Sequence, residues 1–252
     1  MQNQQLIENL EPKDFQEEFT TVWSFPERGA WATHNGDFRG NWAPQIARNL
    51  ILKYSQAGQI VLDNFCGSGT TAIEARLLSR RCLAIDINES AVKLTRKNLN
   101  FKVPFKPDYK PRVEVGDARD LTGVPDGSID LICSHPPYAN VIHYSKGTSG
   151  DLSLLDLPAF LQEMLTVAAA SYRVLKPGGH CAVLIADLRQ NKRVVPLGFE
   201  VMKTYQTAGF ELKEIIIKEQ HNCTMTSAWL DKAKKFGFLL LAHEYLFVFD
   251  KS

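Results

Sequence analysis

A glycine-rich turn follows a short apolar segment in the first third of the chain. Residues 61–71 read VLDNFCGSGTT, with Asp63 at the end of the apolar run and glycines at Gly67 and Gly69. Glycines let the backbone approach a ligand that side chains would exclude. Phosphate loops and dinucleotide-binding folds share this G-x-G pattern. No lysine follows the glycines, which excludes a Walker-type phosphate loop, and the third glycine of G-x-G-x-x-G is missing.

Two further acids end the next two predicted strands. Asp86 ends the first of these, where an acid can accept both hydroxyls of an adenosine ribose, although for this residue taken alone a helix-capping role is the better explanation. Asp117, followed by Ala118, ends the second and can accept a hydrogen bond from an adenine amino group. Because parallel strands end at one edge of a sheet, Asp63, Asp86 and Asp117 predict a single ligand site there.

A fourth motif indicates the chemistry. Residues 134–138 read SHPPY and end another predicted strand. The two prolines cannot continue the strand ladder, so they stiffen its exit. An exocyclic base amine is a poor nucleophile because its lone pair is delocalised into the ring. The turn offers two acceptors for its N–H groups, the Pro136 carbonyl and the His135 side chain, and Tyr138 as a stacking surface. A plain Pro-Pro turn is the alternative, and the upstream acids argue against it.

His135 has two candidate roles in such a site. A neutral imidazole has one acceptor nitrogen, which can take a hydrogen bond from the target amine. With a pKa near its ordinary value, His135 would also accept the proton that the amine loses at neutral pH. The alternative is that His135 only shapes the turn while the Pro136 carbonyl acts alone.

Together, these motifs resemble those of the DNA amino-methyltransferases that form N6-methyladenine or N4-methylcytosine. The resemblance runs from Phe38 to the C-terminus, and residues 38–51 (FRGNWAPQIARNLI) resemble the family's cofactor-closing segment. It implies an α/β fold with a seven-stranded, mostly parallel sheet, helices on both faces and an antiparallel last strand. It also implies S-adenosylmethionine as the cofactor, with direct methyl transfer to the amine and neither a covalent intermediate nor a metal.

The resemblance assigns a role to each motif residue. The cofactor would be contacted by Asp63, Phe65, Gly67, Gly69, Asp86, Asp117 and Ala118. Among these, Asp86 would hold the ribose, and Asp117 with Ala118 the adenine ring. The flipped target base would be received by the catalytic residues His135, Pro136, Pro137 and Tyr138.

Two departures from the family pattern limit the prediction. The family's last motif usually begins with Asp, Asn or Ser, whereas this chain has His135, so the choice between adenine and cytosine stays open. Many relatives carry a target-recognition segment of domain size, and this chain has no room for one. Only the segments Asn140–Leu157 and Asn222–Phe238 are spare, which predicts a short or permissive target.

Strands and helices alternate from Gln59 onward, which predicts a parallel sheet covered on both faces. Asn88 is expected to cap a helix, and residues 176–179 (KPGG) to stop another. Residues 220–238 read as a loop, so the last two strands are expected to pair as an antiparallel hairpin at the sheet edge. The predicted strands cover 59–62, 81–86, 112–115, 129–133, 180–186, 212–218 and 244–249, and the predicted helices 71–78, 157–175 and 197–208.

Length and composition predict one α/β domain over residues 38–252, preceded by an appendage over 1–37. The first ten residues lack the apolar core of a signal peptide, and no apolar run could span a bilayer, so a soluble cytoplasmic protein is expected. The five cysteines lack C-x-x-C spacing and are interpreted as buried, reduced thiols. No His, Cys and acid cluster has metal-ligand spacing, so no metal is expected.

The formal net charge of +1 conceals basic clusters over 93–112, 189–193 and 232–235. A polyanion such as DNA or RNA would suit them, although any one cluster could be an ordinary solvated face. Double-stranded DNA is the expected substrate and RNA the second choice. No membrane partner is expected, and a homodimer or a separate recognition subunit would complete target recognition.

Other functions fit these residues less well. Cytosine C5 methylation needs a cysteine nucleophile, but Cys133 lies within a predicted strand. An RNA guanine-N2 methyltransferase uses a similar glycine motif and a similar Pro-Pro-Tyr, but the residues before Phe38 are too few for an added RNA-binding domain. A protein-glutamine methyltransferase fits the basic clusters less well. A non-catalytic nucleic-acid-binding subunit with the same fold would not need the full run of motifs.

Overall fold

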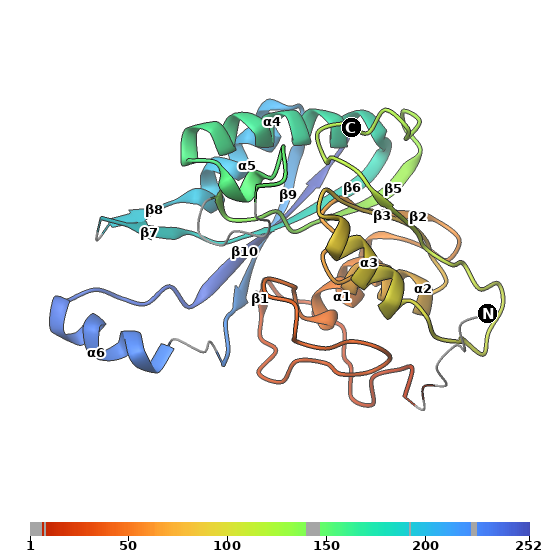
Figure 1. Ribbon diagram of the computed structural model, residues 1–252, viewed down its shortest axis with the longest axis horizontal. Coiled ribbons are helices and arrows are strands. Elements are labelled where there is room, and N and C mark those ends of the chain that lie inside the picture. The colour runs from red at the N-terminus through yellow and green to blue at the C-terminus, as the bar shows by residue number, and fades with distance from the viewer. Residues whose placement is uncertain (1–6, 8, 140–146, 192, 223–225) are drawn as a thin grey trace.

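One mixed sheet runs through the centre of the molecule (Figure 1). The computed structural model describes residues 7, 9–139, 147–191, 193–222 and 226–252, with the side chains of 226–228 excepted. In this part of the chain, eight strands form the sheet in the order β1-β9-β10-β6-β5-β2-β3-β4. Their bounds are β1 (Val22–Trp23), β2 (Ile60–Asp63), β3 (Arg81–Asp86), β4 (Arg112–Val115), β5 (Ile129–Ser134), β6 (Leu175–Ile185), β9 (Glu211–Glu219) and β10 (His243–Asp250).

Strand β10 alone reverses direction within this sheet. It pairs antiparallel with both β6 and β9, whereas the other neighbouring strands of the described sheet pair in parallel. The predicted seven strands with an antiparallel last strand are therefore confirmed. The two-residue strand β1 is an eighth that the sequence did not indicate, because two residues carry no periodic pattern. The pairing of β9 with β10 is also confirmed, but β10 lies inside the sheet and not at its edge.

Helices cover both faces of the sheet (Figure 1). One face packs against α4 (Leu157–Val174) and α5 (Leu197–Thr207), and the other against α1 (Pro44–Tyr54), α2 (Thr70–Leu77) and α3 (Glu89–Asn98). Side chains of β6 alternate between the two cores: Val183 belongs to the first and Leu184 to the second. Because both faces are buried there, the second half of the strand, residues 181–185, is a continuous apolar run.

The predicted elements match closely where a strong local signal exists. The strands over 81–86 and 112–115 have the predicted bounds. Asn88 caps α3 by accepting a hydrogen bond from the Ser90 N–H. Helix α4 ends at Val174, but residues 176–179 lie within β6 and not in a loop.

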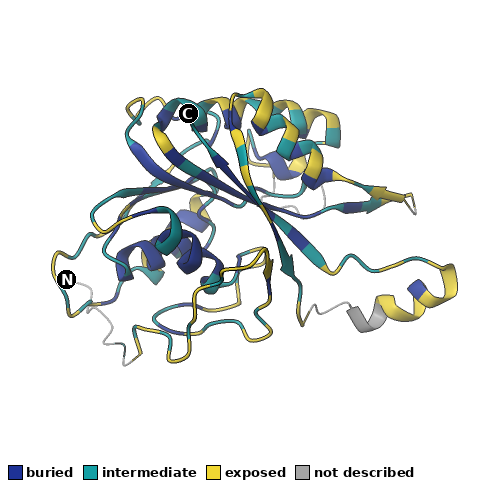
Figure 2. Ribbon diagram, turned by 180° about the vertical axis from the view of Figure 1, so that it is seen from behind, coloured by how far each residue is buried: buried dark blue, intermediate teal, exposed yellow. Residues whose placement is uncertain are grey.

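The predicted loop over 220–238 is wrong in its centre, where α6 (Thr226–Phe236) forms. This helix lies apart from the sheet, and its described side chains are exposed except for that of Ala233 (Figure 2). The short hairpin of β7 (Leu188–Gln190) and β8 (Arg193–Val195) also projects from the body of the molecule (Figure 1).

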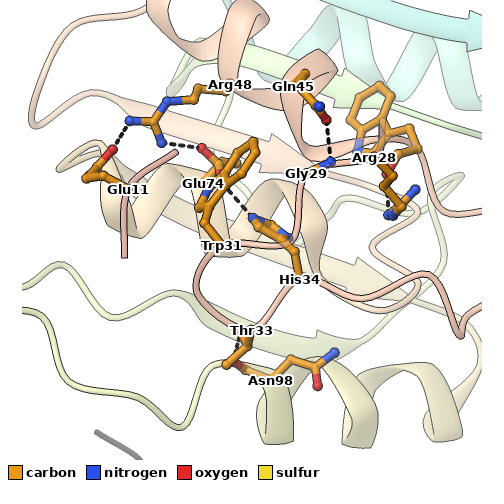
Figure 3. A network of polar contacts seen from close by, with 11 residues as sticks. Glu11, Arg28, Gly29, Trp31, Thr33, His34, Gln45, Arg48, Glu74 and Asn98 are labelled. Atoms are coloured by element: carbon orange, nitrogen blue, oxygen red, sulfur yellow. Dashed lines mark hydrogen bonds and ion pairs between the residues drawn. The ribbon is translucent and has the colours of Figure 1, made fainter. Parts of the chain in front are cut away.

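A buried carboxylate joins the segment before α1 to helix α2 (Figure 3). The Glu74 side chain is fully buried, and it accepts hydrogen bonds from Trp31 Nε1 at 2.7 Å and Arg48 Nη1 at 3.0 Å. His34 Nε2 lies 2.7 Å from the same carboxylate, and Arg48 also pairs with Glu11. We call Glu74, Trp31, His34 and Arg48 the Glu74 cluster. It fixes the N-terminal segment against the sheet domain.

The described cysteines, Cys66, Cys82, Cys133 and Cys181, are free and buried, which confirms the interpretation as reduced thiols. Cys223 lies outside the described residues. Across the described residues, no helix is long and apolar enough to cross a membrane.

Candidate active site

A cleft opens at the carboxyl ends of the parallel strands β2 to β5. The space between its lining residues measures about 860 Å³, open mouth included. Among the predicted site residues, those that line it are Asp63, Phe65, Gly67, Asp86, Asp117, Ala118, His135 and Pro137. Gly69, Pro136 and Tyr138 do not belong to the described lining. The structure therefore brings the four motifs together at one place.

The two glycines of the turn have different structural roles. Both have a positive φ, +51° at Gly67 and +88° at Gly69, a region that side chains disfavour. A Cβ at Gly67 would lie 3.0 Å from the ring of Phe38, which also lines the cleft. A Cβ at Gly69 would lie 2.7 Å from Thr95 Cγ2 on α3. Gly67 thus shapes the cleft, whereas Gly69 allows the turn to pack against a helix.

Asp86 is held in place by two backbone groups. Its Oδ2 accepts a hydrogen bond from the Gly67 N–H at 2.9 Å, and its Oδ1 accepts one from the Asn88 N–H at 2.9 Å. Burial raises the pKa of Asp86. A carboxylate has about four acceptor sites, so two remain for hydroxyl groups of a ligand.

Asp63 is the most perturbed acid of the cleft. Burial, aided by the charge of Asp86, raises the pKa of Asp63 to about 7, although the Phe65 N–H donates to it at 3.2 Å. A positive charge placed nearby stabilises the ionised form of a carboxyl with such a pKa. Asp63 therefore favours a cationic group in the cleft.

Asp117 already has a partner inside the protein. Arg119 donates to it at 2.5 Å and reaches Glu163 at 2.6 Å with its other terminal nitrogen. Burial alone would raise the pKa of Asp117, but the hydrogen bonds from Arg119 bring it below its ordinary value. Asp117 thus stays ionised, and any ligand amine would share it with Arg119.

His135 belongs to a chain of polar side chains that ends on the far strands of the sheet. His135 Nε2 lies 3.0 Å from the Tyr138 hydroxyl, which donates to Glu244 Oε1 at 2.7 Å. Glu244 in turn pairs with Lys218 at 2.9 Å. The Tyr138 hydroxyl uses its single proton in the hydrogen bond to Glu244, so toward His135 it can only accept. His135 Nε2 must therefore carry the proton of that hydrogen bond. The acceptor nitrogen of His135 is then Nδ1.

The pKa of His135 differs from the expected ordinary value. Burial lowers it to about 4, with Glu244 raising it and Lys218 lowering it by smaller amounts. His135 is therefore neutral at physiological pH and a weak base, which is a correction to the proton-accepting role but not to the hydrogen-bonding role. Trp42 stacks on the imidazole, with ring centroids 5.6 Å apart and an interplanar angle of 20°.

Two buried acceptors of the cleft were missed by the sequence analysis. Asp151 Oδ1 accepts a hydrogen bond from the Ser153 N–H at 2.8 Å, while its buried Oδ2 has no partner among the described residues. Asn64 Oδ1 is likewise buried without a described partner, and both residues line the cleft. Buried acceptors are normally paired, so these two atoms await donors from a ligand or water.

The missed residues gave little signal in the sequence. Asp151 lies in a loop that was treated only as spare length, and its first residues, 140–146, lie outside the described structure. Glu244 is 106 residues from Tyr138 and is the second residue of β10. Across the described residues, no group of three or more His, Cys, Asp or Glu side chains could hold a metal ion.

Comparisons with known proteins agree with this site. The family model described as DNA methylase matches residues 1–97, and the model described as Methyltransferase domain matches residues 62–183. The chain is 36% identical over 118 residues to a tRNA (guanine(10)-N2)-dimethyltransferase from Methanothermobacter thermautotrophicus, which covers 46% of this chain and 32% of that protein. It is 27% identical over 93 residues to the Type II methyltransferase M2.MboI from Moraxella bovis, which covers 36% of this chain and 34% of that protein.

The matched regions thus span about a third of these relatives' own lengths. A solved structure of an S-adenosylmethionine-dependent methyltransferase from Methanosarcina mazei has a TM-score of 0.56 at 17% identity, covering 80% of this chain and 96% of that chain. The Rossmann-like methyltransferase fold is therefore confirmed. The resemblance to the DNA amino-methyltransferases and S-adenosylmethionine as the cofactor are confirmed by the matching family models.

Proposed function

We propose that this chain transfers a methyl group from S-adenosylmethionine to an exocyclic amino group of a DNA base, N6 of adenine or N4 of cytosine. One observation carries the proposal: the turn after β5, with His135 and Pro137, opens into the same cleft as Asp63, Gly67 and Asp86. A site for the cofactor and a site for an amine thus share one cavity. The match of residues 1–97 to the family model described as DNA methylase supports DNA as the substrate.

The cleft fits the cofactor by its chemistry. S-adenosylmethionine carries positive charge on its sulfonium and ammonium groups, and it supplies an electrophilic methyl group when bound. The cleft presents Asp63, Asp86 and Asp151 as carboxyl groups and Asn64 as a buried acceptor without a described partner. Asp86 would take the ribose hydroxyls with its two remaining acceptor sites. Phe38 and Trp42, which line the same cleft, would close over the ligand.

The target amine would be held by the turn after β5. His135 Nδ1 and the Pro136 carbonyl would each accept one N–H of the amine, which directs its lone pair away from the base ring. Trp42 and Tyr138 hold the imidazole from two sides, so it need not reorganise during the reaction. The methylated amine would release its proton to solvent, since a histidine with a pKa of about 4 retains a proton poorly.

Mass spectrometry of nucleosides tests this function directly. DNA and RNA are incubated separately with the protein and S-adenosylmethionine bearing a deuterated methyl group. We expect deuterated N6-methyladenine or N4-methylcytosine in DNA, and about tenfold less of it with the His135→Ala variant at the same short exposure time. Cofactor binding without methylation of either nucleic acid would contradict the proposal.

A second candidate is methylation of guanine N2 in RNA. It is favoured by the 36% identity to the archaeal tRNA (guanine(10)-N2)-dimethyltransferase. The same turn would accept the N2 amine of guanine in place of the adenine or cytosine amine. Deuterated N2-methylguanosine in RNA, with unmodified DNA, would select this alternative.

A further inference from the structure

Two projections stand at the same edge of the sheet as the cleft. Strand β6 leads into the β7–β8 hairpin, and α6 lies between the end of β9 and the start of β10. Because β10 runs antiparallel to β6 and β9, its first residue, His243, lies beside the last residue of β9, Glu219. The Gln220 N–H donates to the Ala242 carbonyl at 2.9 Å and closes the base of the projection. Both projections extend to the same side in Figure 1.

The hairpin and the described part of the second projection, residues 229–242, are in contact. Arg189 of β7 donates from Nη2 to the Leu239 carbonyl at 2.9 Å. Its guanidinium also lies 5.0 Å from the centroid of the Phe238 ring. We call residues 229–242 the arm. The arm and the hairpin therefore form one continuous surface.

The arm exposes aromatic and basic side chains together. Trp229 is 45% exposed and Phe236 59%, although large apolar side chains usually find cover. The ammonium of Lys232 lies 4.4 Å from the Trp229 ring centroid, and that of Lys235 lies 5.5 Å from the Phe236 ring centroid. Most of α6 is coloured as exposed in Figure 2.

This surface is mainly basic. The arm contains three lysines, Lys232, Lys234 and Lys235, against the single acid Asp231. The described strands of the hairpin contain Arg189 and Arg193 and no acid. Such a surface attracts a polyanion, and rings beside cations are the usual platform for bases next to phosphates. A protein partner would not require this bias in charge.

The base of the arm is connected to the target-base turn. Lys218, at the end of β9, pairs with Glu244 at the start of β10, and Glu244 accepts the hydroxyl proton of Tyr138. The arm therefore starts from the residues that hold Tyr138 and, through it, His135.

We propose that the arm and hairpin bind the nucleic-acid strand that flanks the target base. The lysines contact phosphates, and Trp229 stacks on an unpaired base. This inference rests on the proposed function, and it adds to the cleft a surface that holds the rest of the substrate. The substrate is held by charge and stacking, so binding depends strongly on salt and weakly on sequence.

Fluorescence anisotropy with labelled single-stranded and double-stranded DNA of mixed sequence tests the inference. The triple variant Lys232→Gln, Lys234→Gln, Lys235→Gln is compared with a matched variant of three exposed lysines outside the basic clusters, Lys13→Gln, Lys203→Gln, Lys213→Gln. We expect the arm variant to lose about tenfold or more in affinity, and its plot of log affinity against log salt to be shallower by about three. Trp229→Ala should lose about fivefold or more, chiefly with the single strand. Both arm variants should keep full affinity for S-adenosylmethionine.

The outcomes separate this inference from the proposed function. If the wild-type protein methylates DNA and the arm variant binds DNA as tightly as wild type, the inference is wrong while the function stands. The exposed rings of the arm would then be a surface for a protein partner. Equal losses of DNA affinity in the arm and control variants would show that overall charge causes the effect, and they would also overturn the inference. If wild type neither binds nor methylates nucleic acid, both proposals fail.

Discussion

The Glu74 cluster and the cleft are built from similar residues and use them differently. Each contains a histidine beside a tryptophan and buried carboxyl groups: His34 and Trp31 in the first, His135 and Trp42 in the second. In the Glu74 cluster, both carboxylate oxygens receive donors from the protein itself (Figure 3). In the cleft, Asp151 Oδ2 has no described partner.

The comparison shows that residue types alone do not mark a functional site. In the sequence, both regions contain acids, a histidine and a tryptophan. The two regions differ in where the polar groups find hydrogen-bond partners. In one they are paired within the protein, and in the other they face a cavity and have shifted pKa values. We therefore expect changes in the Glu74 cluster to affect stability, and changes in the cleft to affect ligand binding and rate.

The largest expected effect is a loss of stability in Glu74→Ala. Removing this carboxylate leaves the buried Arg48 without one of its two acids and Trp31 and His34 without their acceptor. Loss of one partner of a buried ion pair costs about 3–5 kcal/mol in the free energy of unfolding. Urea denaturation followed by circular dichroism measures this loss.

The exposed pair Glu89–Lys93 on α3 provides the control. Glu89→Ala removes an acid of the same type, and the unfolding midpoint should be nearly unchanged. A Glu74→Ala protein as stable as Glu89→Ala would break the comparison, because the Glu74 cluster would then not be structural.

Next in size is the loss of cofactor affinity in Asp86→Ala. The variant loses the acceptor for the ribose hydroxyls and the support of the Gly67 N–H. A charge-assisted hydrogen bond of this kind is worth roughly 1.5–3 kcal/mol, or about tenfold or more in affinity. Isothermal titration calorimetry with S-adenosylmethionine measures it, and Asp86→Asn, which keeps one acceptor oxygen, should lie between the variant and wild type. An unchanged affinity in a folded Asp86→Ala protein would remove the assignment.

The cofactor side of the cleft could be predicted because its signals are local. Asp63 and the glycines lie within a few residues of each other, and Asp86 and Asp117 each follow a strand with clear apolar residues. The partners of His135 could not be predicted in this way. Glu244, Lys218 and Trp42 reach it from distant segments, and only the packing of the sheet brings them together. The apolar residues Trp229, Ala233 and Phe236 recur at helical spacing, and this is the sequence signal for helix α6 that the prediction of a loop overlooked.

His135→Ala should lower the maximal rate by about tenfold and leave cofactor affinity nearly unchanged. A tenfold lower rate corresponds to the loss of one hydrogen bond of about 1.4 kcal/mol to the target amine. Because the pKa of His135 is about 4, the rate should show no inflection near pH 6.5 that depends on this residue. Single-turnover kinetics across pH 6–8 measure both features. His135→Asn offers an acceptor oxygen and should restore part of the rate, whereas a native rate in His135→Ala would leave only the role of shaping the turn.

The smallest expected effect is a rise of a few-fold in cofactor affinity between pH 6 and pH 8. Burial raises the pKa of Asp63 to about 7, so the carboxyl is about one-tenth ionised at pH 6 and about nine-tenths ionised at pH 8. A cationic ligand prefers the ionised form, and its binding lowers this pKa, so affinity must rise with pH across the window and level off above it. The free protein follows the opposite sign: an acid whose folded pKa is raised contributes less stability as pH increases from about 4 to 7. Calorimetric titrations at several pH values measure the affinity, and Asp63→Asn should flatten the profile while wild type keeps its slope. An equal slope in both proteins would assign the pH dependence to the ligand and make Asp63 a second structural carboxyl, like Glu74.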